Sequence, residues 1–589
     1  MKAQAVEMPF LDECSLPRDC PQTLPVIIIG NGPSGICLSY LLSGYTPYLD
    51  PAAEHPNPIL YHKLQKAKHL PIIEQDLEYL CEGLEGRSGN PVALLFDTLL
   101  HPNADLGYEI PSVLQWKLEK QHHIPHLVLG RGAPGGAWHA MEGSILTISL
   151  GIWMELPGVN YRDIISEKRR NVTNDRATPD ELSSYYKNYV KIMGLQKNFV
   201  DNTYVTSIQK LYRDQDINLG KAHGIETDTK NSQKNRIENH CSQNGTESSN
   251  SGFCKGFQNG TENGRGKIDE EEYKKKRDME EIGDIRIPQE FSQGLWEVRG
   301  YQKLQGDNDI PFSLLAENVV LATGASDLPA RLGVEGEDFP FVFHSVRDLG
   351  IAVNHHENLG PTSDPVLVVG AGLSAADAVL CAYNNSIPVL HAFRKQTDDP
   401  GLIFKQLPKT LYPEYHRVYH MMCSQTYLTC PIANHATNPV VHNASTQLYP
   451  DYTSFPEHCV HSFQPDMHCI LRGKNGVLRA IKVSMVLVLI GTHPSLSFLK
   501  DHGRYLGLDP TRPLSCRHNP VDINPYTFEC SAEPGLFAMG PLVGDNFVRF
   551  LKGGALAVAS CLLKRLKQIN IKGKLIADEG DSKGGGGFV

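Results

Sequence analysis

The sequence of 589 residues lacks several features that would assign a protein to a class at once. Its 14 cysteines include no C-x-x-C pair, which disfavours a dithiol reductase site. Apolar runs such as Val26–Ile29 and Met485–Ile490 are too short to cross a bilayer, and the first 22 residues contain no continuous apolar stretch of a signal peptide. Lys and Arg number 56 against 66 Asp and Glu, and the resulting net charge of −10 disfavours nucleic acid as a partner. We therefore expect a protein of the cytoplasm or nucleus with free thiols, no transmembrane segment and no nucleic acid partner.

Apolar residues are nearly absent from one long segment, residues 214–291. Such a segment cannot bury enough surface to offset the entropy lost on ordering, so it predicts a disordered insertion. Its charged cluster, Lys274–Glu281, could bind a protein partner, whereas a solvated charged face is the simpler interpretation. We also expect a flexible N-terminus over residues 1–21 and a flexible tail over residues 568–589.

The remainder of the chain contains short apolar runs bounded by glycine or proline. They are Val26–Ile29, Leu127–Leu129, Val319–Ala322, Val366–Val369, Val389–Ala392, Val483–Ile490 and Leu536–Met539. Such runs followed by helical patterns predict an α/β fold with parallel sheets. Thr178, Pro179 and Glu181 form a capping box that predicts a helix over Pro179–Met193. The His and Cys residues between His458 and Cys469 match no common zinc spacing, so we predict no metal site.

The first glycine motif follows the apolar run that starts at Val26. It reads Gly30-Asn-Gly32-Pro-Ser34-Gly35 and precedes an apolar helical pattern. A strand, a G-x-G-x-x-G turn and a helix let a pyrophosphate approach the backbone at a helix N-terminus. We assign these glycines and Ser34 to a dinucleotide site.

A second motif repeats the pattern as Gly370-Ala-Gly372-Leu-Ser374-Ala375. Alanine is tolerated in the third place because that residue serves packing of the helix on the strand. Two dinucleotide sites are therefore predicted. The next predicted strand ends in Arg394 and Lys395 with no carboxylate, which suits the 2′-phosphate of NADPH, although ordinary surface cations are the alternative.

Three further turns complete a pattern that runs through the chain. Thr323-Gly324 follows the run at Val319, a similar turn follows Val486 to Gly491, and Gly540 to Asp545 follows the last run. Together with the two glycine motifs they resemble the flavoproteins with two dinucleotide-binding domains. The resemblance implies FAD and NADPH as cofactors, held in two interleaved Rossmann-like domains, with Thr323, Gly324, Gly540 and Asp545 among the residues near them.

This resemblance also implies domain boundaries. The FAD-binding domain comprises residues 22–213, 292–345 with the crossing, and 493–567, with residues 46–125 inserted between its first helix and second strand. The NADPH-binding domain comprises residues 346–492.

A sharper resemblance lies in the segment His126-Leu-Val-Leu-Gly130-Arg131 through Gly135-Gly136-Ala-Trp138. It is similar to the second FAD-domain strand and Gly-Gly-x-Trp turn of flavin-dependent N- and S-monooxygenases. This implies that Gly135, Gly136 and Trp138 shape the pocket wall near the flavin and that Arg131 lies at the cofactor.

The sequence departs from those monooxygenases at two places. They usually carry a Glu for the adenosine ribose where this chain has Gly130. Asp50 is an alternative by its distance from Gly35, but Tyr45–Pro51 is a poor strand pattern. In the segment Phe339–His344, which resembles the monooxygenase fingerprint, Pro340 stands where glycine is expected.

At the level of the whole chain, residues 22–565 without the disordered insertion resemble the oxidative-stress-induced growth inhibitor family. The segments that carry this likeness include Gly30–Tyr40, Gly136–Gly143, Glu337–Ser345 and Gly540–Ala555. The resemblance implies a monooxygenase-like protein linked to oxidative stress, restraint of cell growth and a role in meiosis or germ-cell maturation.

The leading hypothesis is therefore an FAD- and NADPH-dependent monooxygenase that uses C4a-peroxyflavin chemistry on a small-molecule substrate with O2. No catalytic side chain is assigned. The alternatives are a regulatory interaction protein that retains the fold with little turnover, motivated by Gly130 and Pro340, and an NADPH oxidase that releases peroxide.

Overall fold

The computed structural model describes residues 23–143, 145–164, 176–211, 294–304, 309–355, 359–427, 449 and 451–582. The predictions of a flexible N-terminus at residues 1–21 and of a disordered insertion at 214–291 lie outside these residues. The described residues up to Lys210 and from Leu295 belong to one compact unit, which holds both of the main sheets described below.

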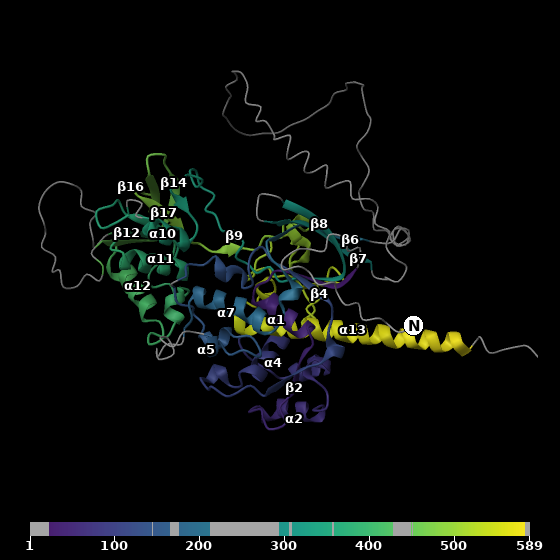
Figure 1. Cartoon of the computed structure of the whole chain (residues 1–589). Coiled ribbons are helices and arrows are strands. Elements are labelled where there is room, and N and C mark those ends of the chain that lie inside the picture. Colours follow the sequence, from purple (N-terminus) through teal and green to yellow (C-terminus); the bar gives the residue numbers. More distant parts are fainter. Residues whose placement is uncertain are drawn as a thin grey trace, which may run out of the picture. The chain divides into compact units, whose positions relative to one another are not determined.

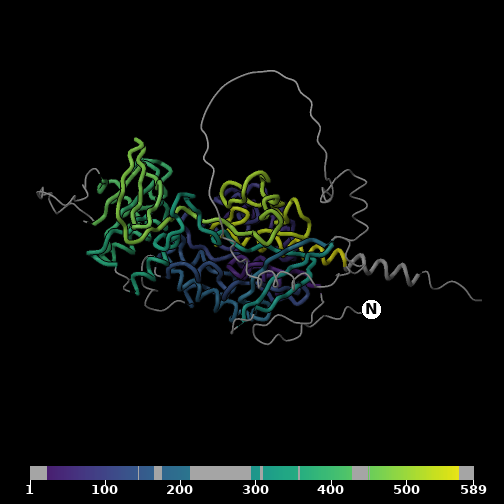
Figure 2. Tube along the Cα trace, turned by 90° about the horizontal axis from the view of Figure 1, so that it is seen from above, coloured from purple at the N-terminus to yellow at the C-terminus, as the bar shows by residue number. Residues whose placement is uncertain are grey.

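The first sheet has seven strands and collects them from distant parts of the chain. Its order is β5 (Phe199–Val200), β4 (His126–Leu129), β1 (Leu24–Ile29), β8 (Asp309–Leu321), β7 (Leu295–Lys303) and β6 (Thr203–Leu211), with β19 (Leu536–Ala538) also paired to β8. β4, β5 and β19 run parallel to β1 and the second half of β8, whereas β7 is antiparallel to the first half of β8. In Figure 2 the yellow-green C-terminal part of the chain returns to the sheet that starts with the purple strand β1.

The second sheet has five parallel strands. Its order is β10 (Val342–Phe343), β17 (Met485–Val488), β11 (Val366–Val369), β12 (Val389–Phe393) and β13 (Tyr452–Pro456). Smaller antiparallel sheets accompany it: β14 (His458–Phe463), β15 (His468–Gly473) and β16 (Leu478–Lys482) form one, and β9 (Leu328–Pro329) pairs with β18 (Thr492–His493) in another.

All seven apolar runs form strands, which confirms those predictions, and buried Val, Ile and Leu fill their ladders. In each of the two main sheets, a glycine turn joins one central strand to a helix. Strand β1 of the first sheet precedes all strands of the second sheet in the chain, and strand β19 of the first sheet follows them all. The predicted fold class, an α/β fold with two interleaved Rossmann-like units, is thereby confirmed.

Helices pack on both Rossmann-like units. They are α1 (Pro33–Leu42), α2 (Pro58–Lys66), α3 (Leu77–Cys81), α4 (Pro91–Leu100), α5 (Tyr161–Ile164), α7 (Pro179–Ile192), α10 (Val346–Asn354), α11 (Leu373–Asn384), α12 (Pro413–Ser424) and α13 (Val548–Ser582). The predicted helix at Pro179 is confirmed as α7, with both hydrogen bonds of the Thr178–Glu181 capping box and Met193 as its C-cap. In Figure 1, α13 lies against α1 and α4.

One expectation needs correction. The poor strand pattern at Tyr45–Leu49 nevertheless forms a strand, β2, which pairs antiparallel with β3 (Leu114–Leu118). Its aromatic and threonine side chains favour extended backbone. β2 lies outside the first sheet, so Asp50 follows a strand that does not belong to the dinucleotide-binding unit. The range of α13, Val548–Ser582, overlaps the flexible tail expected at residues 568–589 as far as Ser582.

Candidate functional site

The first glycine turn combines two tight contacts with one open position. Gly30 has a φ of +111°, and a Cβ atom there would lie 2.3 Å from the carbonyl oxygen of Ala322. A Cβ on Gly35 would lie 2.1 Å from the oxygen of Gly30, so α1 can approach the turn only without a side chain at that position. A Cβ on Gly32 would meet no atom within 4 Å. Gly30 and Gly35 therefore serve packing, and Gly32 leaves open space in front of α1.

The N-terminus of α1 is free to bind an anion. Gly32 is its N-cap and provides no side-chain hydrogen bond to the first turn, which contains no acidic residue. The first N–H groups of a helix have no partner within the helix and carry the positive end of its dipole. Ser34, in the first turn, lines the same open space. This arrangement suits a pyrophosphate.

The second glycine turn repeats the first. Gly370 has a φ of +134°, and a Cβ there would lie 2.3 Å from the oxygen of Leu489, whereas a Cβ on Gly372 would meet nothing within 4 Å. Gly372 is the N-cap of α11, again without a side-chain cap or an acidic residue in the first turn. The two units thus share a glycine turn with open space in front of an uncapped helix N-terminus.

A buried histidine supports the second turn. His391 on β12 contacts the carbonyl oxygen of Gly370 through Nε2 at 2.7 Å and the hydroxyl of Tyr452 through Nδ1 at 2.8 Å. A carbonyl can only accept, so Nε2 carries the hydrogen and Nδ1 accepts from Tyr452. Burial lowers the pKa of His391 to about 4, because the imidazolium would be desolvated there. The ring is therefore a neutral brace of the turn.

The Gly-Gly-x-Trp segment packs on the first turn. The amide of Gly135 donates to the oxygen of Asn31 at 2.9 Å, and a Cβ on Gly136 would lie 3.0 Å from the Cα atom of Gly32. The short 3₁₀ helix Gly136–His139 then directs Trp138 along the open space. This segment positions an aromatic wall directly beside the first glycine turn.

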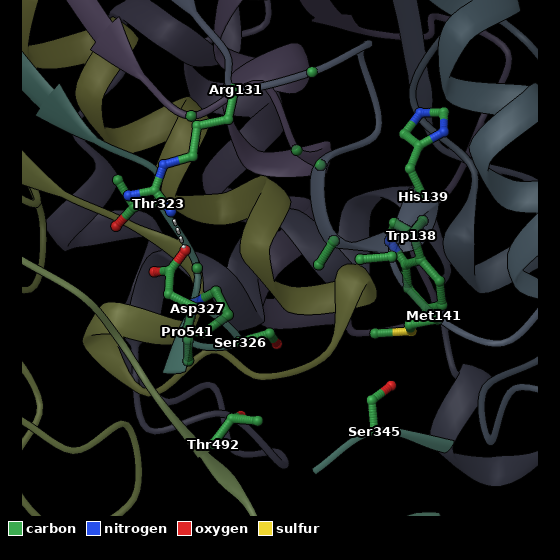
Figure 3. A pocket seen from close by; sticks show the side chains of 18 of the residues that line it. Arg131, Trp138, His139, Met141, Thr323, Ser326, Asp327, Ser345, Thr492 and Pro541 are labelled. Atoms are coloured by element: carbon green, nitrogen blue, oxygen red, sulfur yellow. Dashed lines mark hydrogen bonds and ion pairs between the residues drawn. The ribbon is translucent and has the colours of Figure 1, made fainter. Parts of the chain in front are cut away.

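One cavity of about 1090 Å³ connects these features (Figure 3). It is lined by the two helices that follow the glycine turns, α1 and α11, and by the segments Thr323–Asp327 after β8 and Val342–Asp348. Pro541, which precedes α13, also lines it. Trp138, His139 and Met141 gather on one side of Figure 3, and Arg131, Thr323 and Asp327 on the other. Arg131 forms an ion pair with Asp327 at 3.0 Å, shown as a dashed line.

Sequence reasoning proposed 17 site residues, and the cavity includes part of them. Those that line it are Gly30, Gly32, Ser34, Arg131, Gly136, Trp138, Thr323, Gly324 and Ser374. Those outside its lining are Gly35, Gly135, Gly370, Gly372, Arg394, Lys395, Gly540 and Asp545. Of the latter, Gly35 and Gly370 support the turns, and Gly540 packs on Ser34, because a Cβ on Gly540 would lie 2.6 Å from the Ser34 hydroxyl.

The two cations at the end of β12 differ in their contacts. Lys395 donates to the oxygen of Gly401 at 2.8 Å and lies 3.5 Å from a carboxylate oxygen of Asp399. Arg394 is exposed and has no ion pair with any described residue. Arg394 is therefore the cation that is available to an anionic ligand.

Asp545 has different partners from those that its motif suggests. Its carboxylate accepts from the Ser88 hydroxyl at 2.7 Å and from Nδ2 of Asn90 at 2.8 Å. Burial raises the pKa of Asp545 to about 6, although these two hydrogen bonds lower it in part. Asp545 thus ties the residues before α13 to the segment before α4.

Two acidic groups near the cavity were missed by sequence reasoning. Glu337 accepts from the amides of Leu332 and Gly333 at 2.8 Å and contacts Nε2 of His344, which lines the cavity, at 3.2 Å. Burial alone would raise the pKa of Glu337, but these hydrogen bonds outweigh it and lower the pKa. Asp377 of α11 also lines the cavity and accepts from the Tyr415 hydroxyl at 3.0 Å, and burial raises its pKa to about 7. The only sequence signal was the position of each residue close to a motif.

No three His, Cys, Asp or Glu side chains of the described residues gather closely enough to hold a metal ion. Within that same part of the chain, every helix is too short or too polar to cross a membrane.

No protein-family model matches the chain. It is 53% identical over 561 residues to human oxidative stress-induced growth inhibitor 2, covering 95% of this chain and 97% of that protein. It is 45% identical over 544 residues to human oxidative stress-induced growth inhibitor 1, covering 92% and 96%, and 25% identical over 567 residues to the Caenorhabditis elegans homolog, covering 94% and 96%.

Solved structures are more distant. Bacillithiol disulfide reductase from Bacillus cereus is 14% identical with a TM-score of 0.49, and the match covers 92% of this chain and 100% of that one. Ornithine hydroxylase from Pseudomonas aeruginosa is 11% identical with a TM-score of 0.46, and again 92% and 100% are covered.

Proposed function

The chain belongs to the oxidative stress-induced growth inhibitor family, and on that premise we propose that it is an FAD- and NADPH-dependent oxidoreductase of the monooxygenase type. The observation that carries the proposal is the pair of open glycine turns, at Gly32 and Gly372, whose helices α1 and α11 line one cavity. The cavity of about 1090 Å³ lies at the upper end of the roughly 300–1,000 Å³ typical of ligand sites, which suits a large ligand.

FAD fits the first unit. A pyrophosphate requires free backbone N–H groups and no side chain before them, and both conditions are met at Gly32. Gly30, Ser34 and Gly35 complete that turn, while Thr323, Gly324 and Arg131 lie along the same cavity. The domain boundaries expected from the sequence belong to this proposal, with FAD held by residues 22–213, 292–345 and 493–567.

NADPH fits the second unit, residues 346–492. Gly370, Gly372 and Ser374 would hold its pyrophosphate, and the exposed Arg394, with Lys395 beside it, would bind the 2′-phosphate. When bound, NADPH supplies hydride and reduced FAD supplies the electrons that activate O2.

The protein contributes orientation, exclusion of water and proton handling. Trp138 and Met141 form an apolar wall of the cavity. The contact with Glu337 assigns the proton of His344 to Nε2, and Nδ1 can then accept a proton from a group in the cavity. Gly540 packs on Ser34 and so supports the first glycine turn. Asp545, through its hydrogen bond with Ser88, holds the residues before α13 in place.

The cellular roles belong to the same proposal: growth restraint under oxidative stress, as the names of the relatives indicate, and the meiotic role expected from the resemblance. The nine cysteines of the described residues are free thiols, which supports a reducing compartment such as the cytoplasm or nucleus.

The test of this function is the visible absorption spectrum of the purified chain, followed by anaerobic addition of NADPH. We expect oxidised flavin bands that bleach on addition. Subsequent admission of O2 separates a monooxygenase, which consumes NADPH with formation of product, from an oxidase, which releases peroxide. A protein that stays colourless after reconstitution with FAD would contradict the proposal and favour the regulatory interaction protein.

Arg394→Ala should raise the KM for NADPH by roughly tenfold to a hundredfold and leave the KM for NADH unchanged. A hydrogen bond to a charged group contributes about 1.5–3 kcal/mol, which corresponds to that range. Steady-state reduction of FAD with each cofactor measures the effect. Arg512→Ala, an exposed arginine outside the second unit, is the matched control and should change neither constant. An equal rise for both cofactors would show that Arg394 does not bind the 2′-phosphate.

A further inference from the structure

The strand ends of the two units can be compared residue by residue. The amide of Gly30 donates to Leu129 at 2.9 Å, and the amide of Gly370 donates to Ala392 at 3.0 Å. Leu129 and Ala392 are therefore equivalent, and Gly130 corresponds to Phe393. A side chain at the end of this strand is where a dinucleotide-binding unit usually places the acceptor for the adenosine ribose. The first unit has no side chain there.

Asn31 fills the place of the missing side chain. A Cβ atom on Gly130 would lie 2.0 Å from Nδ2 and 2.2 Å from Cγ of Asn31. Asn31 is 4% exposed and lines the cavity. Its counterpart between the glycines of the second unit is Ala371, which has no polar group. The amide at position 31 and the glycine at position 130 thus form a complementary pair that occurs only in the first unit.

The hydrogen bonds of Asn31 define which atom remains for a ligand. Nδ2 donates to the carbonyl oxygen of Gly132 at 2.5 Å and lies 3.5 Å from a carboxylate oxygen of Asp201. A carbonyl can only accept, so the orientation of the amide is determined. Oδ1 accepts from no group of the described residues. Asn31 therefore offers the cavity an acceptor and uses its donors within the protein.

We propose that Oδ1 of Asn31 accepts a hydrogen bond from a ribose hydroxyl of the adenosine half of the dinucleotide in the first unit, in place of a strand-end carboxylate. This inference rests on the proposed function, because it presupposes that the first unit binds FAD. A hydroxyl can donate to Oδ1 as it would to a carboxylate oxygen. Arg131 cannot take this role, because a guanidinium has no acceptor for a hydroxyl hydrogen.

The experiment is a double-mutant cycle on the full-length apoprotein. It compares binding of FAD with binding of an FAD analogue whose adenosine lacks both ribose hydroxyls, measured by quenching of flavin fluorescence. Wild-type protein should bind the analogue about tenfold more weakly than FAD, as expected for one lost hydrogen bond. Asn31→Ala should bind FAD about tenfold more weakly than wild type and should no longer distinguish the two flavins.

Gly130→Glu provides an independent variant. Alone it should weaken FAD binding, because its Cβ would displace the Asn31 amide. Combined with Asn31→Ala, the glutamate has room to replace the lost acceptor, so the double variant should recover the discrimination between the two flavins. Asn198→Ala removes another amide of the same unit, 3% exposed and outside the cavity, and is the matched control for loss of a buried asparagine.

Discrimination between the flavins that persists in Asn31→Ala would overturn the inference and leave the proposed function intact. So would equal loss of both flavins in Asn31→Ala and Asn198→Ala, since that would show a merely structural role. Where Asn31→Ala does not fold, Gly130→Ala is the fallback variant, because its Cβ displaces the Asn31 amide and brings no acceptor of its own. Unimpaired discrimination by Gly130→Ala would overturn the inference in the same way. Wild-type protein that binds no FAD would overturn the proposed function and this inference together.

Discussion

Gly32→Leu should lower the affinity for FAD at least about a hundredfold without changing the stability of the apoprotein. The backbone at Gly32 has a φ of −73°, which any residue adopts, and a Cβ there would meet no protein atom within 4 Å. The new side chain therefore costs the fold little, but it occupies the space before the N–H groups of α1. Several charge-assisted hydrogen bonds, each of about 1.5–3 kcal/mol, would be lost with the pyrophosphate. Flavin content after gel filtration and thermal unfolding of the apoprotein measure the two effects.

The chain offers two controls for this variant. Gly372→Leu places the same change in the second unit, so it should abolish NADPH binding and leave flavin content unchanged. Gly35→Ala should instead destabilise the apoprotein, because its Cβ would lie 2.1 Å from the oxygen of Gly30. Normal flavin content in Gly32→Leu would refute the assignment of the first unit as the FAD site.

Asp97→Ala should destabilise the protein by about 3–5 kcal/mol. Asp97 of α4 accepts from Nε and Nη2 of Arg549, at 2.6 and 2.7 Å, and both side chains are nearly buried. Asp105 holds the third contact of Arg549, at 2.8 Å. Removing one partner of a buried ion pair leaves a desolvated charge, which is the costly case for such pairs. Arg549 would keep only the more exposed Asp105.

The measurement is the shift in urea unfolding followed by circular dichroism, with Asp338→Ala as the matched control. Asp338 also pairs with an arginine, Arg331, but its side chain is 86% exposed, so its loss should cost less than about 1 kcal/mol. We also expect reduced flavin retention in Asp97→Ala, because Val548 and Leu551 beside Arg549 line the cavity. Equal shifts for the two variants would show that the buried pair contributes no more than a surface pair.

Local sequence determined the parts of this protein that depend on neighbours in the chain. The strand, glycine turn and helix lie within Leu24–Leu42 in the first unit and Val366–Asn384 in the second, and apolar runs, glycines with unusual φ and helix starts are all local signals. The capping box at Thr178 is equally local, and it was predicted correctly. The order of these motifs resembles that of flavoproteins with two dinucleotide-binding domains, and the interleaving of the two units was expected from that resemblance.

Only the tertiary structure decided which polar side chains form hydrogen bonds with residues far away in the sequence. Asp545 and Ser88 are 457 positions apart, and Asn31 and Gly132 are 101 apart, so no periodicity or spacing indicates either contact. In the sequence, Gly130 indicates that a strand-end acceptor is missing. In the fold, the Asn31 amide occupies the space that a side chain at position 130 would fill. Contacts such as those of Asn31 and Asp545 form only when the fold brings distant parts of the chain together, so local sequence does not indicate them.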